Sequence, residues 1–477
     1  MKKEHFKTAI LVLLVFSSII LTVNKWFSEK LWPDGYNFFS NLTNYFSFGD
    51  KADDKTYYLS KENISNPSEI IINGNELRSI YKHTSLEYNS MLSEVKDILK
   101  NSLSISSFEE SSAESWTNAL KKASIYISYP VAYDSKTFSA IMDCTVGDFG
   151  ISHMQEFIIA AGDNITGKPH LLIKDASNDE KFSDITLNTN SLNIDKLINT
   201  YATSSVGEYP YSFELNFDKT NDAIEQKIIL EPQVLLSIGQ VSNPSATCIN
   251  YFDDISSDRQ LYNQFLKSFG YNTTNLRKNV NLDNSIVFVE NYSSVTMHPD
   301  GYLEYRSLDD TKGINLGTGV NSTFYDSFID CIEFVNNIWD TACSELNMDI
   351  NLSSVNVDGN NSFKLTIDYY ANGMEVVSRL PKTESHDKMN HAIEITVKNS
   401  KIVSYKQIVR GYSINSDLSE CGSAIEALDI LMANDTIKSD TIEDLYLAYN
   451  QLENSNLCVP CWVAKTDKNE IRIINNR

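Results

Sequence analysis

The stretch VTMHPDGYLEYR, residues 295–306, decides the fold class of this chain. Apolar and polar side chains alternate on both sides of Asp300-Gly301, as they do in strands that bury one face. Asp followed by Gly supplies the positive φ angles that a two-residue hairpin requires. The stretch therefore predicts two antiparallel strands joined by a tight turn.

Similar turn signals recur in the last third of the chain, at Asn372-Gly373 and Asn399-Ser400, again between alternating runs. Residues 459–464 and 471–474 predict a final strand pair, in which Pro460 favours an edge or strand-start position because it has no N–H to donate. These segments together predict an antiparallel sheet.

Helical patterns accompany the strands. Apolar residues over 86–99 mark one face of a helix, and a shorter helix over 116–120 leads into an alternating strand at Ser124–Tyr129. Ser423-x-x-Glu426 and Thr441-x-x-Asp444 place an acid three residues after a hydroxyl, which is the pattern of a capped helix start, so two more helices are predicted there. The fold class is therefore α+β, with antiparallel sheets packed by helices.

The N-terminus carries a predicted membrane anchor. Residues 8–23 hold no charge and are rich in Leu, Ile, Val and Phe, and with their aromatic flanks they predict a transmembrane helix over 6–27. Lysines are denser before it than after it, so residues 1–5 are expected in the cytoplasm and the rest outside. A cleaved signal peptide is the alternative, but the exit at 21–26 lacks a small-x-small cleavage pattern. We expect a single-pass protein of the cell membrane.

The composition of the chain argues against one class of partner, nucleic acid. The chain has 477 residues, 42% of them hydrophobic, and a formal net charge of -23, which repels phosphate backbones, so nucleic acid is not an expected partner. Seven cysteines are too few and too scattered for a disulfide framework in a chain of this length. The length suggests two or three domains.

Beyond the anchor we expect a connector and three extracytoplasmic domains. Aromatic residues crowd the juxtamembrane connector, 28–56. The predicted α+β domains are an N-terminal one over 57–165, a central one over 166–285 and a C-terminal one over 286–477. Ser212–Asp218 resembles Ser362–Asp368, each expected as a strand after a helix-like stretch, which suggests that the last two domains have similar topology.

Three patterns are typical of reactive or metal sites, and each lacks a necessary part. Ser79-Ile-Tyr-Lys82 has the spacing of an acyl-transfer nucleophile on a helix, but no Lys-Thr-Gly element follows, so an exposed helix pair is expected. Cys458-Val-Pro-Cys461 lies in an expected strand rather than at a helix start. His386 and His391, five apart, would lie on different sides of a helix without the acid of a zinc motif. No catalytic residue, cofactor or metal site is predicted.

One face of the predicted span is a candidate partner-binding surface. Ser18 and Thr22 lie one helical turn apart and share a face with Leu11, Leu14 and Leu21. Small and hydroxylated residues let transmembrane helices approach closely and exchange hydrogen bonds. The alternative is that both hydroxyls bond to carbonyls of their own helix.

Several of these features resemble the YycH (also WalH) family. They are the basic start, the span ending in Trp26-Phe27, the run Glu29–Tyr36, the Asp300–Tyr305 hairpin and the Pro460-x-Trp462 close. The resemblance implies an N-terminal domain followed by two of similar topology, and it brings no catalytic residues. Cys458 and Cys461 depart from the family pattern.

The resemblance also implies a function. Members of this family are single-span proteins of Gram-positive bacteria that act, with the related YycI protein, on the YycG/WalK-type membrane sensor histidine kinase of a two-component system that controls the cell wall. We therefore expect a non-enzymatic regulator, with contacts to the kinase, a YycI-like protein and the lipid bilayer. The alternatives are a wall-directed hydrolase or acyl-transfer enzyme, and an extracytoplasmic ligand-binding module.

Overall fold

The computed structural model describes most of the chain from Leu59 onward, in the ranges 59, 64, 66–74, 76–82, 88–105, 107–162, 167–187, 191–205, 208–217, 228–274, 276–290, 292–317, 323–343, 348–359, 361–433, 441–452, 455–467 and 471–474. The predicted anchor, the connector and the span face lie outside these residues. Within them, every helix is too short or too polar to cross a bilayer.

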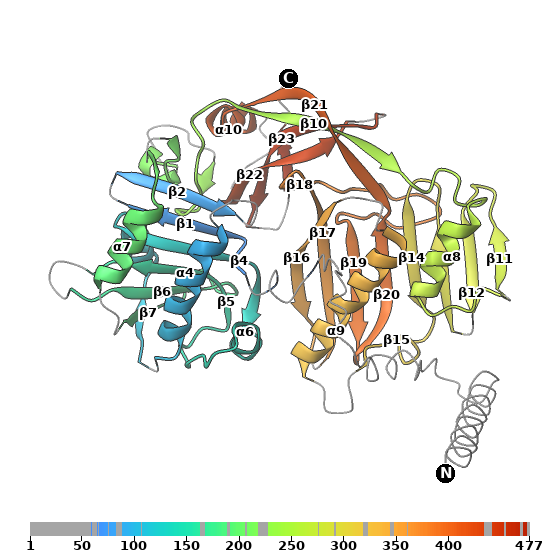
Figure 1. The fold of residues 1–477 in the computed structure, drawn as a ribbon, viewed down its shortest axis with the longest axis horizontal. Coiled ribbons are helices and arrows are strands. Elements are labelled where there is room, and N and C mark those ends of the chain that lie inside the picture. The colour runs from blue at the N-terminus through green and yellow to red at the C-terminus, as the bar shows by residue number, and fades with distance from the viewer. Residues whose placement is uncertain are drawn as a thin grey trace, which may run out of the picture. The chain divides into compact units, whose positions relative to one another are not determined.

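Among the described residues, an eight-stranded antiparallel sheet forms the N-terminal part (Figure 1). Its spatial order is β3 (Glu109–Ser111), β7 (Phe182–Thr186), β6 (His170–Asp175), β5 (His153–Ala160), β4 (Ser124–Asp134), β1 (Glu69–Asn73), β2 (Leu77–Lys82) and β8 (Ser204–Ser205). The helices are α4 (Tyr88–Leu103), α5 (Ala113–Leu120), α6 (Ser135–Met142) and α7 (Ser191–Tyr201). The helices expected over 86–99 and 116–120, and the strand expected at Ser124–Tyr129, are thus confirmed.

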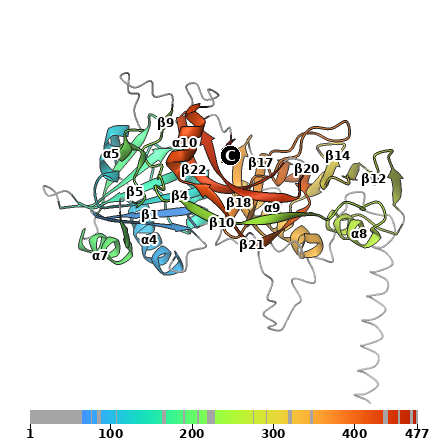
Figure 2. The same cartoon turned by 90° about the horizontal axis from the view of Figure 1, so that it is seen from above.

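Helices cover both faces of this sheet. Figure 2 shows α4 and α7 on one side of the strands and α5 on the other. Successive strand residues point to opposite faces, so Ile70 and Ile72 pack in the core under α4, whereas Ile71 joins the core of Trp116 on α5. Along β4, Ile125 and Ile127 likewise lie in the first of these cores and Tyr126 lies in the second, so the predicted strand is buried on both faces.

A second sheet forms the C-terminal part, with sixteen strands among the described residues. Its main path is β11 (Arg277–Val280), β12 (Ile286–Glu290), β13 (Ser293–Met297), β14 (Tyr302–Ser307), β20 (Lys401–Ile408), β19 (Ile393–Lys398), β17 (Phe363–Ala371), β18 (Met374–Val376), β22 (Thr441–Gln451), β23 (Leu457–Thr466), β10 (Val241–Asn250) and β21 (Arg410–Gly422). The side branches are β9 (Ile229–Leu230), β15 (Ile314–Asn315), β16 (Asp349–Val357) and β24 (Ile471–Ile474). All pairs are antiparallel except β18–β22 and β9–β22.

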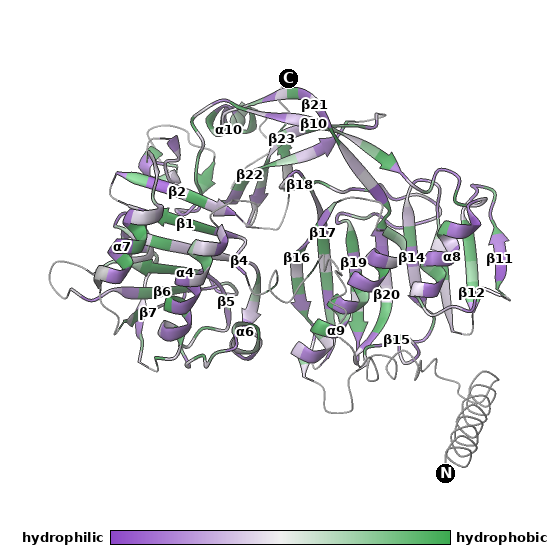
Figure 3. Ribbon diagram, in the orientation of Figure 1, coloured by the Kyte–Doolittle hydropathy of each residue, from purple (hydrophilic) through white to green (hydrophobic). Residues whose placement is uncertain are grey.

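Two helices, α8 (Arg259–Ser268) and α9 (Phe324–Ile338), lie against one face of the strands β11 to β20 (Figure 1). Their apolar side chains, including Phe265 and Val335, share a core with Leu303 and Tyr305 of β14. Figure 3 shows the matching hydropathy, with purple on the outer surfaces of these helices and green on the strands behind them. Tyr302, one residue before Leu303, points to the opposite face and packs in a separate cluster.

The hairpins predicted from sequence are confirmed. Asn372-Gly373 joins β17 to β18 and Asn399-Ser400 joins β19 to β20 as two-residue turns, and both residues of each have positive φ angles. β13 and β14 also form the predicted hairpin, but four residues, 298–301, join them and only Gly301 has a positive φ, at 98°. The mixed α+β class with antiparallel sheets is confirmed as well.

The predicted final strand pair is β23 with β24, and Pro460 lies where its missing N–H is harmless. The pairs of β23 with β10 end at Cys458, and those with β24 begin at Trp462. Pro460 lies between these two sets of pairs, so β22 is the one strand that pairs with it. The edge position expected for this proline is therefore local to residues 459–461 of an interior strand.

The helix predicted at Thr441 is wrong. Thr441-x-x-Asp444 does not open a helix: it begins strand β22, because Ile442 and Leu445 bury against neighbours on paired strands and this outweighs a weak local cap. The cap at Ser423 does open a helix, α10 (Ala424–Ala433), with Glu426 N–H donating to Ser423 Oγ at 3.2 Å.

The similarity between residues 212–218 and 362–368 also fails as a structural repeat. Ser212–Leu215 is a short 3-10 helix, whereas Phe363–Ala371 is strand β17. Glu214 explains the difference, because its carboxylate turns back to accept the N–H of Tyr211 and forms two hydrogen bonds with the buried Arg78. Side chains remote in sequence thus select the local conformation.

Leu59, the first residue that the structure describes, is attached to α9 by the side chain of Asn336. The Asn336 amide donates to the Leu59 carbonyl at 2.9 Å and accepts the Leu59 N–H at 3.0 Å. Both residues are almost fully buried, at 4% and 2% exposed. An amide is needed here because it offers a donor and an acceptor side by side, as a neighbouring strand would.

Candidate functional site

The sequence patterns considered for reactivity form no catalytic set. Ser79 and Lys82 lie on strand β2 rather than on a helix, so the expected helix pair is wrong and the two side chains point to opposite faces. Ser79 Oγ accepts the Thr203 N–H at 2.8 Å, and Lys82 Nζ lies 3.5 Å from Glu69 Oε1. β2 is a strand because it pairs along its length with β1.

The two cysteines of the Cys-x-x-Cys pattern lie in β23, and both are buried free thiols. Burial raises the pKa of Cys458 and of Cys461 to about 12. A thiol with such a pKa is protonated at neutral pH and is a poor nucleophile. The placement in a strand agrees with the prediction, and it gives these thiols no helix dipole.

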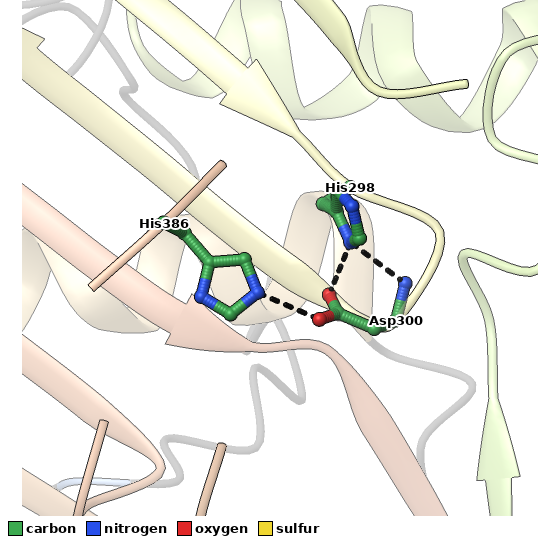
Figure 4. A group of neighbouring side chains, drawn as sticks. All are labelled: His298, Asp300 and His386. Atoms are coloured by element: carbon green, nitrogen blue, oxygen red, sulfur yellow. Dashed lines mark hydrogen bonds and ion pairs between the residues drawn. The ribbon is translucent and has the colours of Figure 1, made fainter. Parts of the chain in front are cut away.

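A cluster that sequence spacing did not reveal lies at the β13–β14 turn (Figure 4). It consists of His298, which follows β13, Asp300 in the turn itself, and His386 in the loop between β18 and β19. An isolated bridge between Leu380 and Met389 closes that loop and brings His386 over the turn. We refer to His298, Asp300 and His386 as the His-Asp-His cluster.

Both imidazoles point at the carboxylate of Asp300, as Figure 4 shows. His386 Nε2 lies 2.7 Å from Asp300 Oδ2, and His298 Nδ1 lies 2.8 Å from Asp300 Oδ1. The His386 side chain is fully buried and stacks on the ring of Tyr302, with centroids 4.4 Å apart. The cluster is therefore packed rather than loosely held at the surface.

The outer nitrogen of each imidazole also has a partner. His386 Nδ1 lies 2.9 Å from the carbonyl oxygen of Asp387, and His298 Nε2 lies 3.5 Å from Asp283 Oδ2. A carbonyl can only accept, so we assign a proton to His386 Nδ1. These partners fix the orientation of both rings.

The electrostatics favour ionised carboxylates here. Burial would raise the pKa of Asp300, but the hydrogen bonds with His386 and His298 outweigh burial and lower it. Hydrogen bonds from Ser285 and Ser385 also hold the pKa of Asp283 well below its usual range. The cluster thus presents an ionised acceptor between two imidazoles, which can hold a cation.

Of the two histidines compared in the sequence, only His386 belongs to the cluster. His391 does not approach the cluster; its Nδ1 lies 3.0 Å from Asp368 Oδ2 of β17. His386 is not on a helix, so the five-residue spacing carried no information about its neighbours. The one available signal was His298-Pro-Asp300 at the predicted hairpin, two potential ligands two residues apart. Their third partner could be found only from the fold.

Comparisons with known proteins identify the architecture. The family model described as "YycH protein, N-terminal domain" matches residues 4–204. The crystal structure of YycH from Bacillus subtilis is similar to this chain with a TM-score of 0.55 and 15% sequence identity, over 88% of this chain and 98% of that one. No curated protein matches. The resemblance predicted from sequence is therefore confirmed: residues 4–204 match the N-terminal domain of the YycH family, and most of the chain shares the fold of YycH.

Proposed function

We propose that this protein is a non-enzymatic regulator of a YycG/WalK-type sensor histidine kinase. The match of residues 4–204 to the YycH N-terminal domain is the observation that carries the proposal. The likeness to the B. subtilis YycH fold over most of the chain supports it. A YycI-like membrane protein is the second proposed partner.

We further propose that the chain is anchored by a single span over 6–27 and that its large C-terminal part is extracytoplasmic. The uncharged run over 8–23 and the lysines before it support this topology. Protease added to intact protoplasts should then degrade the bulk of the protein and spare the N-terminal segment. Full protection of residues 57–477 would refute the topology.

A regulator of this kind acts by binding one kinase state more tightly than another, because a partner that binds both equally shifts nothing. The span face of Leu11, Leu14, Ser18, Leu21 and Thr22 is the proposed contact with the kinase helices. The two hydrogen bonds between the Asn336 amide and the Leu59 backbone attach the chain that follows the connector to α9. This attachment supports mechanical coupling between the connector and the C-terminal sheet.

The decisive experiment is copurification of the detergent-solubilised protein with the histidine kinase. Replacing both Ser18 and Thr22 with Leu should reduce kinase association while protein abundance stays constant. The matched control is Leu13→Ile with Ile20→Leu, which conserves apolar volume. Equal association of both double variants and the wild type would refute the span contact, and no association of the wild type would refute the regulator.

A wall-directed acyl-transfer enzyme is the alternative with a direct test. It requires an activated serine, and Ser79 Oγ is instead held by the Thr203 backbone with Lys82 on the other face of the strand. A labelled covalent adduct with a β-lactam that is lost in Ser79→Ala would establish this enzyme in place of the regulator.

A further inference from the structure

We propose that the His-Asp-His cluster binds a divalent transition-metal ion, such as zinc. Its three residues offer two imidazole nitrogens and one carboxylate, and the ligand atoms lie within 4.8 Å of one another. A tetrahedral ion with bonds of about 2.0–2.2 Å keeps its ligands about 3.4 Å apart. A small adjustment of the side chains therefore suffices for all three to share one ion.

His386 Nε2 and the Asp300 carboxylate face each other, and either a proton or a metal ion between them satisfies both groups. His386 Nδ1 donates to the Asp387 carbonyl at 2.9 Å, and Nε2 lies 2.7 Å from a carboxylate oxygen of Asp300. Two lone pairs at that distance repel unless a positive charge lies between them. A metal ion satisfies both groups at once.

At His298, Nδ1 is the nitrogen that faces the cluster. The backbone N–H of Asp300 donates to His298 Nδ1 at 3.3 Å, which requires a lone pair on that nitrogen. An imidazole nitrogen has one lone pair, so an ion bound to Nδ1 would replace this long hydrogen bond. His298 Nε2 is then the protonated nitrogen, directed at Asp283 Oδ2.

The groups behind the ligands match those of known metal sites. A metal-binding histidine usually donates its other N–H to a carboxylate or a backbone carbonyl, which fixes the ring and its tautomer. Here Asp283 takes this part for His298, and the carbonyl of Asp387 takes it for His386. Ser285 and Ser385 in turn hydrogen-bond the Asp283 carboxylate and hold it in place.

An ion at this position would tie the β13–β14 hairpin to the loop between β18 and β19. Both border the small apolar cluster of Tyr302, Leu380, Met389 and Ile408, on the sheet face opposite α8 and α9. Imidazole and carboxylate ligands suit zinc and its neighbours better than calcium or magnesium. The proposed role is structural and does not depend on the regulatory function.

The test is a calorimetric titration of Zn²⁺ into the purified full-length protein after treatment with EDTA. We expect one site per chain, with affinity reduced more than 100-fold in His386→Gln and in Asp300→Asn. Asp283→Asn, which leaves the ligands intact, should weaken binding about 10- to 100-fold. The matched control is His391→Gln, a histidine–aspartate pair outside the cluster, which should bind zinc like the wild type.

X-ray absorption at the zinc edge of the wild-type complex gives a readout that does not depend on the folding of any variant. Nitrogen and oxygen ligands without sulfur support the site. A sulfur shell, no binding by the wild type, or unchanged affinity in folded His386→Gln and Asp300→Asn would overturn it. In the last case the cluster would hold protons between its rings and the carboxylate rather than a metal.

Discussion

Replacement of Asn336 by Leu tests the attachment of Leu59 to α9. The substitution keeps the number and branching of the side-chain heavy atoms and removes both hydrogen bonds to the Leu59 backbone, at 2.9 and 3.0 Å. If Leu59 stays docked, its N–H and C=O are buried without partners, at about 1–3 kcal/mol each. If Leu59 leaves, burial of its side chain is lost, which costs about 2 kcal/mol.

The protein adopts whichever of these two outcomes costs less free energy. We therefore expect Asn336→Leu to lower the free energy of unfolding by about 2 kcal/mol. Equilibrium unfolding in urea measures this change, and limited proteolysis near Leu59 should become faster. Asn337→Leu is the matched control, because the next residue of α9 is exposed and the same substitution there should change stability by less than about 0.5 kcal/mol. A loss below that value in Asn336→Leu would refute the clamp.

Three further predictions follow from buried polar contacts. Arg78→Met removes a bidentate ion pair with Glu214 and should lower the free energy of unfolding, measured in urea, by about 3 kcal/mol. The double variant with Glu214→Gln should lose less stability than the sum of the two single variants. Burial would lower the pKa of His391, but Asp368 outweighs burial and raises it. The wild type should therefore be more stable than His391→Gln below about pH 6.5 and lose this advantage as the pH rises through the folded-state pKa of His391. The same stability difference at low and at high pH would contradict this prediction. The two buried thiols of β23 should resist iodoacetamide at neutral pH in the native protein and react once it is unfolded; rapid native labelling followed by mass spectrometry would disprove their burial.

Much of the fold could be predicted because its signals are local. The Asn372-Gly373 and Asn399-Ser400 turns depend on positive φ angles within two residues, and the Ser423 cap depends on a hydrogen bond within one helical turn. Such interactions are encoded by neighbouring residue types and form wherever those residues occur. The family resemblance likewise rested on such local motifs.

Only the tertiary structure decided the rest, because it depends on partners far along the chain. Thr441 begins a strand rather than a helix since β23 offers it a ladder of hydrogen bonds. His386 meets Asp300 across 86 residues, and Asn336 meets Leu59 across 277. Short patterns determine a turn or a cap, but a side chain's distant partner is set by sheet order and burial, which residue spacing alone does not encode.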